Sequence, residues 1–239
     1  TGVKCHSSYS YLPPKKYWKD HPEYYCMDES GKRFCQPDAR YSNGQICYSN
    51  PDVRRICLES LLAFIERDRK KHPDNPPLVY DMTQQDAMSF LCLCPECRKI
   101  IAKYNRKPGG HAEGGDAGLQ LEFINDLARK AAAKYPGVQI RTFAYVSTEV
   151  PPAGGIRPED NVIIWMCDLY TRCNHMLPLS HPFNAPRRKL IEDWAAISKR
   201  LEIWDYMLYD VDYSRGRLFP EVSVDAIASD AKFFRDLGL

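Results

Sequence analysis

The segment that decides the fold is residues 117–146, AGLQLEFINDLARKAAAKYPGVQIRTFAYV. Its first part places apolar side chains on one face at helical spacing: Ala117, Leu121, Ile124, Ala128, Ala131 and Tyr135. Pro136 and Gly137 end this period, and an apolar run follows over 139–146. A helix that passes through a short turn into a buried strand is typical of a parallel α/β sheet.

The same alternation extends in both directions along the chain. Further helices are expected over 52–70, 187–200 and 223–237, and strands over 2–6, 45–48, 78–82, 139–146, 161–167 and 201–207. Residues 24–27 and 33–35 add a small hairpin as a seventh strand. Because a closed barrel has eight strands, the sequence predicts an incomplete (β/α)₈ TIM-barrel-like domain. We expect residues 1–239 to form this single domain, as a fragment of a larger multidomain protein.

Composition excludes several classes of protein. The 33 Lys and Arg against 31 Asp and Glu leave a net charge of +2 in 239 residues, and neither sign gathers in one half, so a nucleic-acid partner is not expected. The longest apolar run, 162–167, is far shorter than the roughly 20 residues that cross a bilayer. We therefore expect no membrane span. No basic and then apolar leader opens the sequence, so a signal peptide is not expected in this chain.

The loops indicate where the functional face lies. The links that leave strands, 83–95, 147–160 and 168–186, are long and rich in Pro, Gly, Cys and charge, whereas the links that enter strands are short. In α/β barrels the loops at the carboxyl ends of the strands build the active site. We therefore expect the site at that end of the sheet.

Polar and aromatic residues follow the predicted strand ends. The candidate catalytic carboxylates are Asp86, Asp205 and Asp168, and the candidate substrate contacts are His6, Tyr9, Tyr145, Glu149, Trp204 and Tyr206. Glycoside hydrolysis needs a protonated acid for the leaving oxygen and a second carboxylate opposite it, and aromatic faces suit sugar rings. This pattern favours a hydrolase of glycosidic bonds in an oligo- or polysaccharide, with Asp86 as general acid and Asp205 or Asp168 as its partner.

Other interpretations of these residues stay open. The carboxylates would also suit a metal with oxygen ligands, and Asp205 and Asp81 would each suit an ion pair with Arg or Lys inside the barrel. Asp86 would also cap a helix over 87–90. The alternative function is a non-catalytic glycan-binding barrel, in which Trp204, Tyr206, Tyr145 and Tyr9 stack on sugar and the carboxylates only bind hydroxyls.

Three cysteines are close together in the sequence. Cys92, Cys94 and Cys97 form a C-x-C-x-x-C pattern that suits a structural zinc, a disulfide to a distant cysteine, or reduced thiols in a tight turn. A fourth zinc ligand would come from Cys47, Cys173, His111 or a second chain, and Cys47 is our choice. We expect the cluster to hold the loop that follows Asp86 and so to orient that carboxylate. No cofactor is expected for catalysis itself.

Eight stretches, taken together, resemble a known family. They are HPEYY at 21–25, GKR at 31–33, CYSNPDV at 47–53, TQQD at 83–86 followed by CLCPEC at 92–97, AY at 144–145, DNVII at 160–164 and IWDY at 203–206. In this order they resemble the domain-of-unknown-function 4838 family. The resemblance implies a TIM-barrel, glycoside-hydrolase-like domain of large, mostly secreted bacterial proteins. It therefore implies neighbouring domains and a secreted, periplasmic or cell-surface location.

The sequence departs from the family pattern at two places. Family members usually carry Asn-Asp where this chain has Gln85-Asp86, so the acid is kept and its neighbour differs. They often carry a glutamate near the position of Tyr170, where the nearest carboxylate here is Asp168. The second catalytic group is therefore the less well defined of the two.

Overall fold

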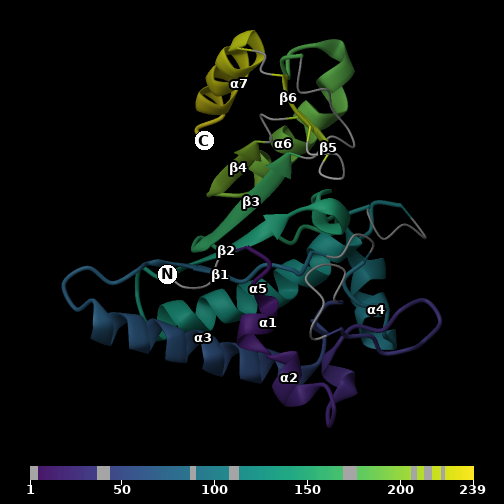
Figure 1. Ribbon diagram of the computed structural model, residues 1–239, viewed down its shortest axis with the longest axis vertical. Coiled ribbons are helices and arrows are strands. Elements are labelled where there is room, and N and C mark those ends of the chain that lie inside the picture. The colour runs from purple at the N-terminus through teal and green to yellow at the C-terminus, as the bar shows by residue number, and fades with distance from the viewer. Residues whose placement is uncertain are drawn as a thin grey trace.

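A four-stranded parallel sheet forms the centre of the protein in this computed structural model (Figure 1). The structure describes residues 5–36, 44–86, 90–107, 113–168, 177–205, 209–212, 217–221 and 224–239. The strands are β1 (Val79–Asp81), β2 (Gln139–Ala144), β3 (Val162–Asp168) and β4 (Leu201–Asp205), in that order across the sheet. A separate antiparallel pair is formed by β5 (Tyr209–Asp212) and β6 (Arg217–Glu221). The fold is thus mixed α/β, as expected.

The prediction of individual strands is confirmed for the parallel sheet, and it is wrong for 45–48 and for the hairpin. Its four strands match the expected runs with ends that differ by at most two residues. Within the described residues, 45–48 forms only an isolated antiparallel bridge from Ile46 to Tyr25, and the expected hairpin is reduced to a bridge between Met27 and Arg33. The expected strand over 2–6 lies mostly outside the described residues. The parallel sheet of the described residues therefore has fewer strands than the six or seven expected.

The long helices are those that the hydrophobic period predicts. The described part of the chain contains α1 (Ser8–Tyr11), α2 (Pro14–Tyr17), α3 (Pro51–Lys71), α4 (Pro95–Tyr104), α5 (Gly115–Lys134), α6 (Ala185–Ile197) and α7 (Val224–Asp236). The start of α3 has a clear cause, since the Asn50 side chain accepts hydrogen bonds from the backbone N–H groups of Asp52 and Val53 and Pro51 occupies the first turn. None of the helices within the described ranges is long and apolar enough to cross a bilayer.

The two faces of the sheet carry different side chains. Alternate residues of β2 and β3, such as Ile140 and Ile164, are fully buried in the main core with α3 and α5. In Figure 1 these two helices run side by side beneath the sheet. The opposite face carries a second, smaller cluster of Phe143, Tyr145 and Cys167, against which Trp165 and Trp204 pack. This aromatic face is therefore built separately from the helix-packed face.

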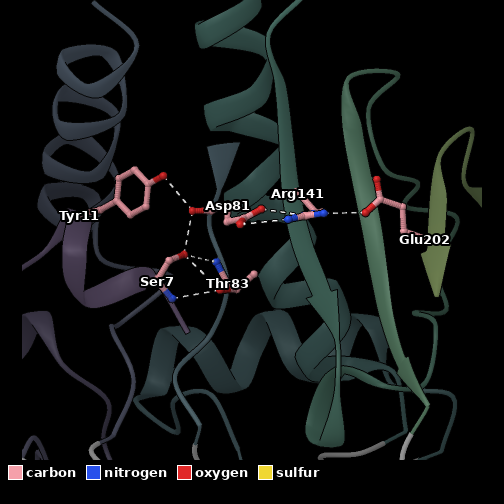
Figure 2. Close-up of polar contacts among 6 residues, drawn as sticks. All are labelled: Ser7, Tyr11, Asp81, Thr83, Arg141 and Glu202. Carbon is pink, nitrogen blue, oxygen red and sulfur yellow. Dashed lines mark hydrogen bonds and ion pairs between the residues drawn. The ribbon is translucent and has the colours of Figure 1, made fainter. Parts of the chain in front are cut away.

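A charged network links strands across the aromatic face (Figure 2). Arg141 of β2 donates to the carboxylate of Asp81 on β1 through Nε at 2.7 Å and Nη2 at 3.2 Å, and to Glu202 on β4 at 2.8 Å. Its guanidinium lies 3.9 Å from the ring centroid of Trp165 on β3. The interpretation of Asp81 as an ion-paired residue of the sheet is confirmed.

A buried ion pair attaches α6 to the loop after β2. Arg187 is fully buried, and its Nη1 donates to the carboxylate of Glu149 while its Nη2 donates to the Cys167 carbonyl at 2.6 Å. Trp194 of the same helix donates its indole N–H to the Glu149 carbonyl at 2.8 Å. The sheet and α6 are thus joined by polar groups that have little access to water.

Removal of Arg187 should destabilise the fold strongly. In Arg187→Met the Glu149 carboxylate stays buried without its cation, and breaking such a pair costs about 3–5 kcal/mol. The measurement is the free energy of unfolding in urea. Arg188→Met is the matched control, because Arg188 lies on the same helix but forms an exposed pair with Glu192, and exposed pairs contribute little. Equal losses in the two variants would contradict this account of α6.

Candidate functional site

Residues 83–86, which we call the polar turn, come one residue after β1, and the first three of them are almost fully buried. Thr83 and Gln84 have no exposed surface, and Gln85 keeps 5%. Ser7 and Thr83 exchange hydrogen bonds, with Ser7 N–H donating to Thr83 Oγ1 at 3.0 Å and Thr83 N–H donating to Ser7 Oγ at 2.9 Å. Figure 2 shows how Ser7 and Tyr11 also reach the Asp81 carbonyl, each at 2.8 Å. The chain before α1 is therefore fastened to the end of β1.

The Gln84 side chain connects the polar turn to α5 and to the end of β2. Its amide nitrogen donates to the Tyr145 carbonyl at 2.9 Å. Its amide oxygen accepts from Gln120 Nε2 at 3.1 Å and from Thr148 Oγ1 at 2.9 Å. A buried amide with this many partners holds its position, because breaking any of these bonds leaves a polar group without water.

Gln85 is held on both its backbone and its side chain. Its N–H donates to Gln45 Oε1 at 2.8 Å, and its carbonyl accepts from Gln45 Nε2 at 2.9 Å. Its own side-chain nitrogen donates to the His6 carbonyl at 2.8 Å and to Ser8 Oγ at 2.9 Å. Together with the contacts of Gln84, the polar turn thus joins four segments that are distant in sequence: residues 6–8, residue 45, α5 and the chain after β2.

The next residue, Asp86, lies at the edge of the sheet formed by the carboxyl ends of β1–β4, which we call the carboxyl edge. The Tyr145 hydroxyl donates to Asp86 Oδ1 at 3.0 Å. The His6 ring lies 5.9 Å from the Tyr145 ring and 5.4 Å from the Phe143 ring, measured between centroids. The structure therefore brings together three residues of the predicted site: Asp86, Tyr145 and His6.

The tautomer of His6 follows from its partner. His6 Nδ1 lies 3.0 Å from the Gln84 carbonyl oxygen. Since a carbonyl only accepts, Nδ1 carries the hydrogen in this contact. Nε2 of the neutral ring is then an acceptor, which suits a bound hydroxyl group.

Two residues of the carboxyl edge have a strained backbone. His6 has φ of +55° and Val146 has φ of +51°, in the left-handed region that side chains rarely adopt. The Val146 conformation is especially costly, because its side chain is β-branched. Strain of this kind persists only where the surroundings enforce it, and it gathers at functional sites. Val146 directly follows Tyr145, so both strained residues adjoin the contact between Tyr145 and Asp86.

Asp205 lies on the helix-packed side of the sheet, opposite the aromatic face. Asp168 and Asp205 are register partners at the ends of β3 and β4. Alternation places Asp205 on the side of Leu201 and Ile203, which pack in the main core. The side chain of Asp168 is outside the described residues. Trp204 lies on the aromatic face, with its ring 4.8 Å from that of Trp165.

Of the other predicted substrate contacts, Tyr9 and Glu149 have partners elsewhere in the fold. Tyr9 accepts a hydrogen bond from the Cys35 thiol at 3.4 Å and packs edge-on against Tyr25. Glu149 is buried against Arg187, as described above. Tyr206 lies outside the described residues. We therefore leave Tyr9 and Glu149 out of the ligand contacts proposed below.

The four cysteines chosen as metal ligands meet at one point, which we call the cysteine cluster. Cys47, Cys92, Cys94 and Cys97 are all buried, and their sulfur atoms lie within 4.8 Å of one another. Cys47 Sγ lies 3.6 Å from Cys94 Sγ, 3.9 Å from Cys97 Sγ and 3.7 Å from Cys92 Sγ. All four are free cysteines. The choice of Cys47 as the fourth member is thus confirmed, and the cluster is compatible with a structural metal.

The spacing of these sulfur atoms matches a tetrahedral ion. Zn–S bonds of about 2.3 Å at tetrahedral angles put sulfur atoms about 3.8 Å apart, whereas a disulfide needs about 2.05 Å. Ser49 Oγ adds a polar contact to Cys97 Sγ at 3.1 Å, and the Met27 N–H donates to Cys92 Sγ at 3.4 Å. Arg33 Nη1 lies 3.9 Å from Cys92 Sγ. The Met27 N–H and the Arg33 guanidinium are donors that suit a cluster carrying thiolate charge.

Several residues of the site escaped the sequence analysis. Gln45 and Gln120 contact the polar turn, and Arg33 and Ser49 contact the cysteine cluster. None of the four was a candidate site residue, although Arg33 and Ser49 lie within two of the stretches that resemble the family. A signal did exist for α5. Asp116 and Gln120 are four residues apart and fully or almost fully buried, in a helix whose neighbouring positions are apolar. Polar residues at that spacing in an otherwise apolar helix indicate a buried polar contact.

Asp116 is the buried carboxyl group of this layer. It has no exposed surface, and its Oδ2 accepts from the Leu91 N–H at 3.1 Å. Burial raises its pKa to about 7, while the Ser147 hydroxyl and the Leu91 N–H act in the opposite direction. The neutral acid is therefore the form that the folded protein prefers over much of the acidic range.

This pKa predicts a pH dependence of stability. An unfolded Asp ionises near pH 3.9, so between about pH 4 and 7 the folded state binds more protons and the free energy of unfolding falls as the pH rises, by up to about 1.4 kcal/mol per unit. Asp116→Asn keeps an acceptor for the Leu91 N–H and removes this term. The measurement is urea unfolding of both proteins from pH 4 to pH 8. The free energy of unfolding of the wild type minus that of Asp116→Asn should fall steadily up to about pH 7 and then level off. A difference that is constant with pH would show that Asp116 is ionised in the fold.

Comparison with known proteins gives one match. A protein-family model described as domain of unknown function (DUF4838) matches residues 1–239, which is the whole chain. No curated protein matches the chain. The buried polar turn, the contact between Asp86 and Tyr145 and the cysteine cluster are accordingly features of a protein that belongs to the DUF4838 family.

Proposed function

We propose that this protein is a carbohydrate-active domain that binds a glycan at the carboxyl edge and hydrolyses its glycosidic bonds. The observation that carries the proposal is the 3.0 Å hydrogen bond from Tyr145 to Asp86, set between two residues with strained backbones. His6 offers an acceptor nitrogen beside it. Phe143, Trp165 and Trp204 offer aromatic surface of the kind on which sugar rings stack.

In this proposal Asp86 is the general acid, and Asp168 or Asp205 is its partner. Strand order favours Asp168, because Tyr145 follows β2, and β3 is the neighbouring strand while β4 is one strand further. Neighbouring strands are about 4.8 Å apart, which is compatible with the separations of about 5–10 Å found between paired carboxylates of glycosidases. The proposal includes the finer fold, in which this sheet is part of a (β/α)₈ barrel and the carboxyl edge is its mouth.

The second candidate is a glycan-binding domain without hydrolysis. Its support is the alternation that places Asp205 on the helix-packed side, while the aromatic rings and Arg141 lie on the other side. In that case Asp86 would bind sugar hydroxyls, and Trp204, Tyr145 and His6 would supply the stacking and polar contacts. Both candidates use the same edge, so one set of variants separates them.

Asp86→Asn should separate hydrolysis from binding. The variant keeps an oxygen that accepts from Tyr145 but cannot transfer a proton, so hydrolysis should fall by about 10²–10⁴-fold while glycan binding persists. The measurement is turnover and binding on a panel of oligo- and polysaccharides. Asp126→Asn is the control, because Asp126 forms a surface pair with Lys130 on α5, and it should behave as wild type.

Three outcomes of that experiment are informative. Binding without turnover by the wild type would favour the glycan-binding domain. Turnover that survives Asp86→Asn would remove Asp86 as the acid. A wild type that neither binds nor hydrolyses any glycan of the panel would count against both candidates.

We also propose that the cysteine cluster holds a structural Zn²⁺. The proposal is supported by four buried sulfur atoms at tetrahedral spacing, with hydroxyl, amide and guanidinium groups beside them. Four cysteine ligands without an open position are typical of structural zinc sites. A location outside the cytoplasm and flanking domains in the parent protein are further parts of the proposal. Such a location would strengthen the need for a metal, because four free thiols this close together tend to oxidise in an oxidising compartment.

Zinc content and thermal stability should depend on the cysteine cluster. Cys94→Ser should lose most of the zinc, and even about 3 kcal/mol of metal-dependent stability lowers Tm by about 6–12 °C in a domain of this size. Elemental analysis of the purified protein and thermal unfolding measure the two effects. Cys57→Ser is the control, because Cys57 is equally buried but lies on α3 outside the cluster.

The control should keep its zinc even if the new hydroxyl lowers Tm. The zinc proposal fails if the wild type purifies without metal and takes up none, or if Cys94→Ser retains as much zinc as Cys57→Ser.

A further inference from the structure

The Gln45 side chain bonds both backbone groups of Gln85. It is 1% exposed, it accepts from the Gln85 N–H at 2.8 Å, and it donates to the Gln85 carbonyl at 2.9 Å. This paired contact has the pattern of a strand ladder, although it is made by a side chain. Because Gln85 is buried, removing these two hydrogen bonds costs more than it would at the surface.

Each of the two residues in this contact is followed closely in the sequence by a member of the cysteine cluster. Cys47 comes two residues after Gln45, and Cys92 comes six residues after Asp86. An ion bound by Cys47 and Cys92 would therefore join the segment that carries Gln45 to the segment that carries Asp86. The metal and the hydrogen bonds between Gln45 and Gln85 would then join the same two segments at neighbouring points.

Gln85 connects the contact with Gln45 to the residues of the candidate site. Its side chain donates to the His6 carbonyl and to Ser8 Oγ, so a shift of Gln85 moves the strained residue His6. The adjacent residue is Asp86, whose carboxylate is placed by Tyr145. Both polar groups proposed to meet the glycan therefore depend on the position of Gln85.

We infer that metal occupancy of the cysteine cluster controls the geometry of the carboxyl edge through Gln45, which acts as a positioning residue. This inference rests on the zinc proposal but not on the identity of the ligand or on hydrolysis. According to this inference, the metal does more than stabilise the fold, because the affinity of the carboxyl edge for its ligand depends on metal occupancy. Linkage also requires the reverse effect, so weakening the contact between Gln45 and Gln85 must weaken metal binding by the same coupling.

The first test uses the wild-type protein and residue-specific hydrogen exchange. The Gln85 amide should exchange at least about fivefold faster after zinc is removed with a chelator, in line with typical coupling between sites. The Ile140 amide is the internal control, since it donates to the Asn161 carbonyl within the sheet and has no link to the cluster. Equal acceleration at both amides, or no acceleration at Gln85, would overturn the inference.

The second test uses Gln45→Met, which keeps the size of the side chain and removes both hydrogen bonds. Zinc affinity, measured by competition with a chromogenic chelator, should fall at least about fivefold, and the Gln85 amide should exchange fast even in the zinc-loaded protein. Gln120→Met is the matched control, because Gln120 is also 1% exposed and contacts only the side chain of Gln84 in the polar turn. It should retain wild-type zinc affinity.

The outcomes distinguish this inference from the proposals on which it builds. A protein that binds zinc with unchanged Gln85 exchange overturns the coupling and leaves the zinc site standing. A protein that binds no zinc overturns both. If Gln45→Met does not fold, the wild-type comparison between Gln85 and Ile140 decides alone.

Discussion

The polar turn at residues 83–86 is the constraint on which the rest of the site depends. Thr83, Gln84 and Gln85 are buried, so every backbone and side-chain group there must find a partner inside the protein. The partners come from the chain before α1, from residue 45, from α5 and from the end of β2. Satisfying these groups fixes those segments relative to one another, and Asp86 emerges at the carboxyl edge with its position already determined.

The parallel sheet makes this arrangement possible. Its register places the ends of β1 to β4 at a common edge, and the network of Asp81, Arg141 and Glu202 ties three strands on the aromatic face. On the other face α5 supplies both apolar contacts and the polar groups of Asp116 and Gln120. The cysteine cluster then fastens the segment beyond Asp86. Stability and site geometry therefore rest on the same buried polar contacts.

Sequence patterns predicted the elements that repeat and missed those that depend on single contacts. The hydrophobic period located the four long helices and the four parallel strands, because burial on a sheet imposes that period on many residues. It wrongly predicted a strand over 45–48, because residues 46–48 are apolar but are held by one bridge and by side-chain contacts. Cysteine spacing led to the cluster, including Cys47. Gln45, Arg33 and Asp116 stayed hidden, since a single buried polar residue has no period and its partner is distant in sequence. For the same reason the pairing of Glu149 with the buried Arg187 could not be predicted from the sequence.

The central claim is that the carboxyl edge around Asp86 is a glycan-binding surface. The most direct test is NMR titration of the zinc-loaded protein with oligosaccharides, following the side-chain resonances of His6, Tyr145 and Trp204. The account predicts saturable shifts at these three residues, with Tyr9 unaffected because its side chain packs against Tyr25 and Cys35. Saturable shifts confined to other parts of the molecule would contradict it.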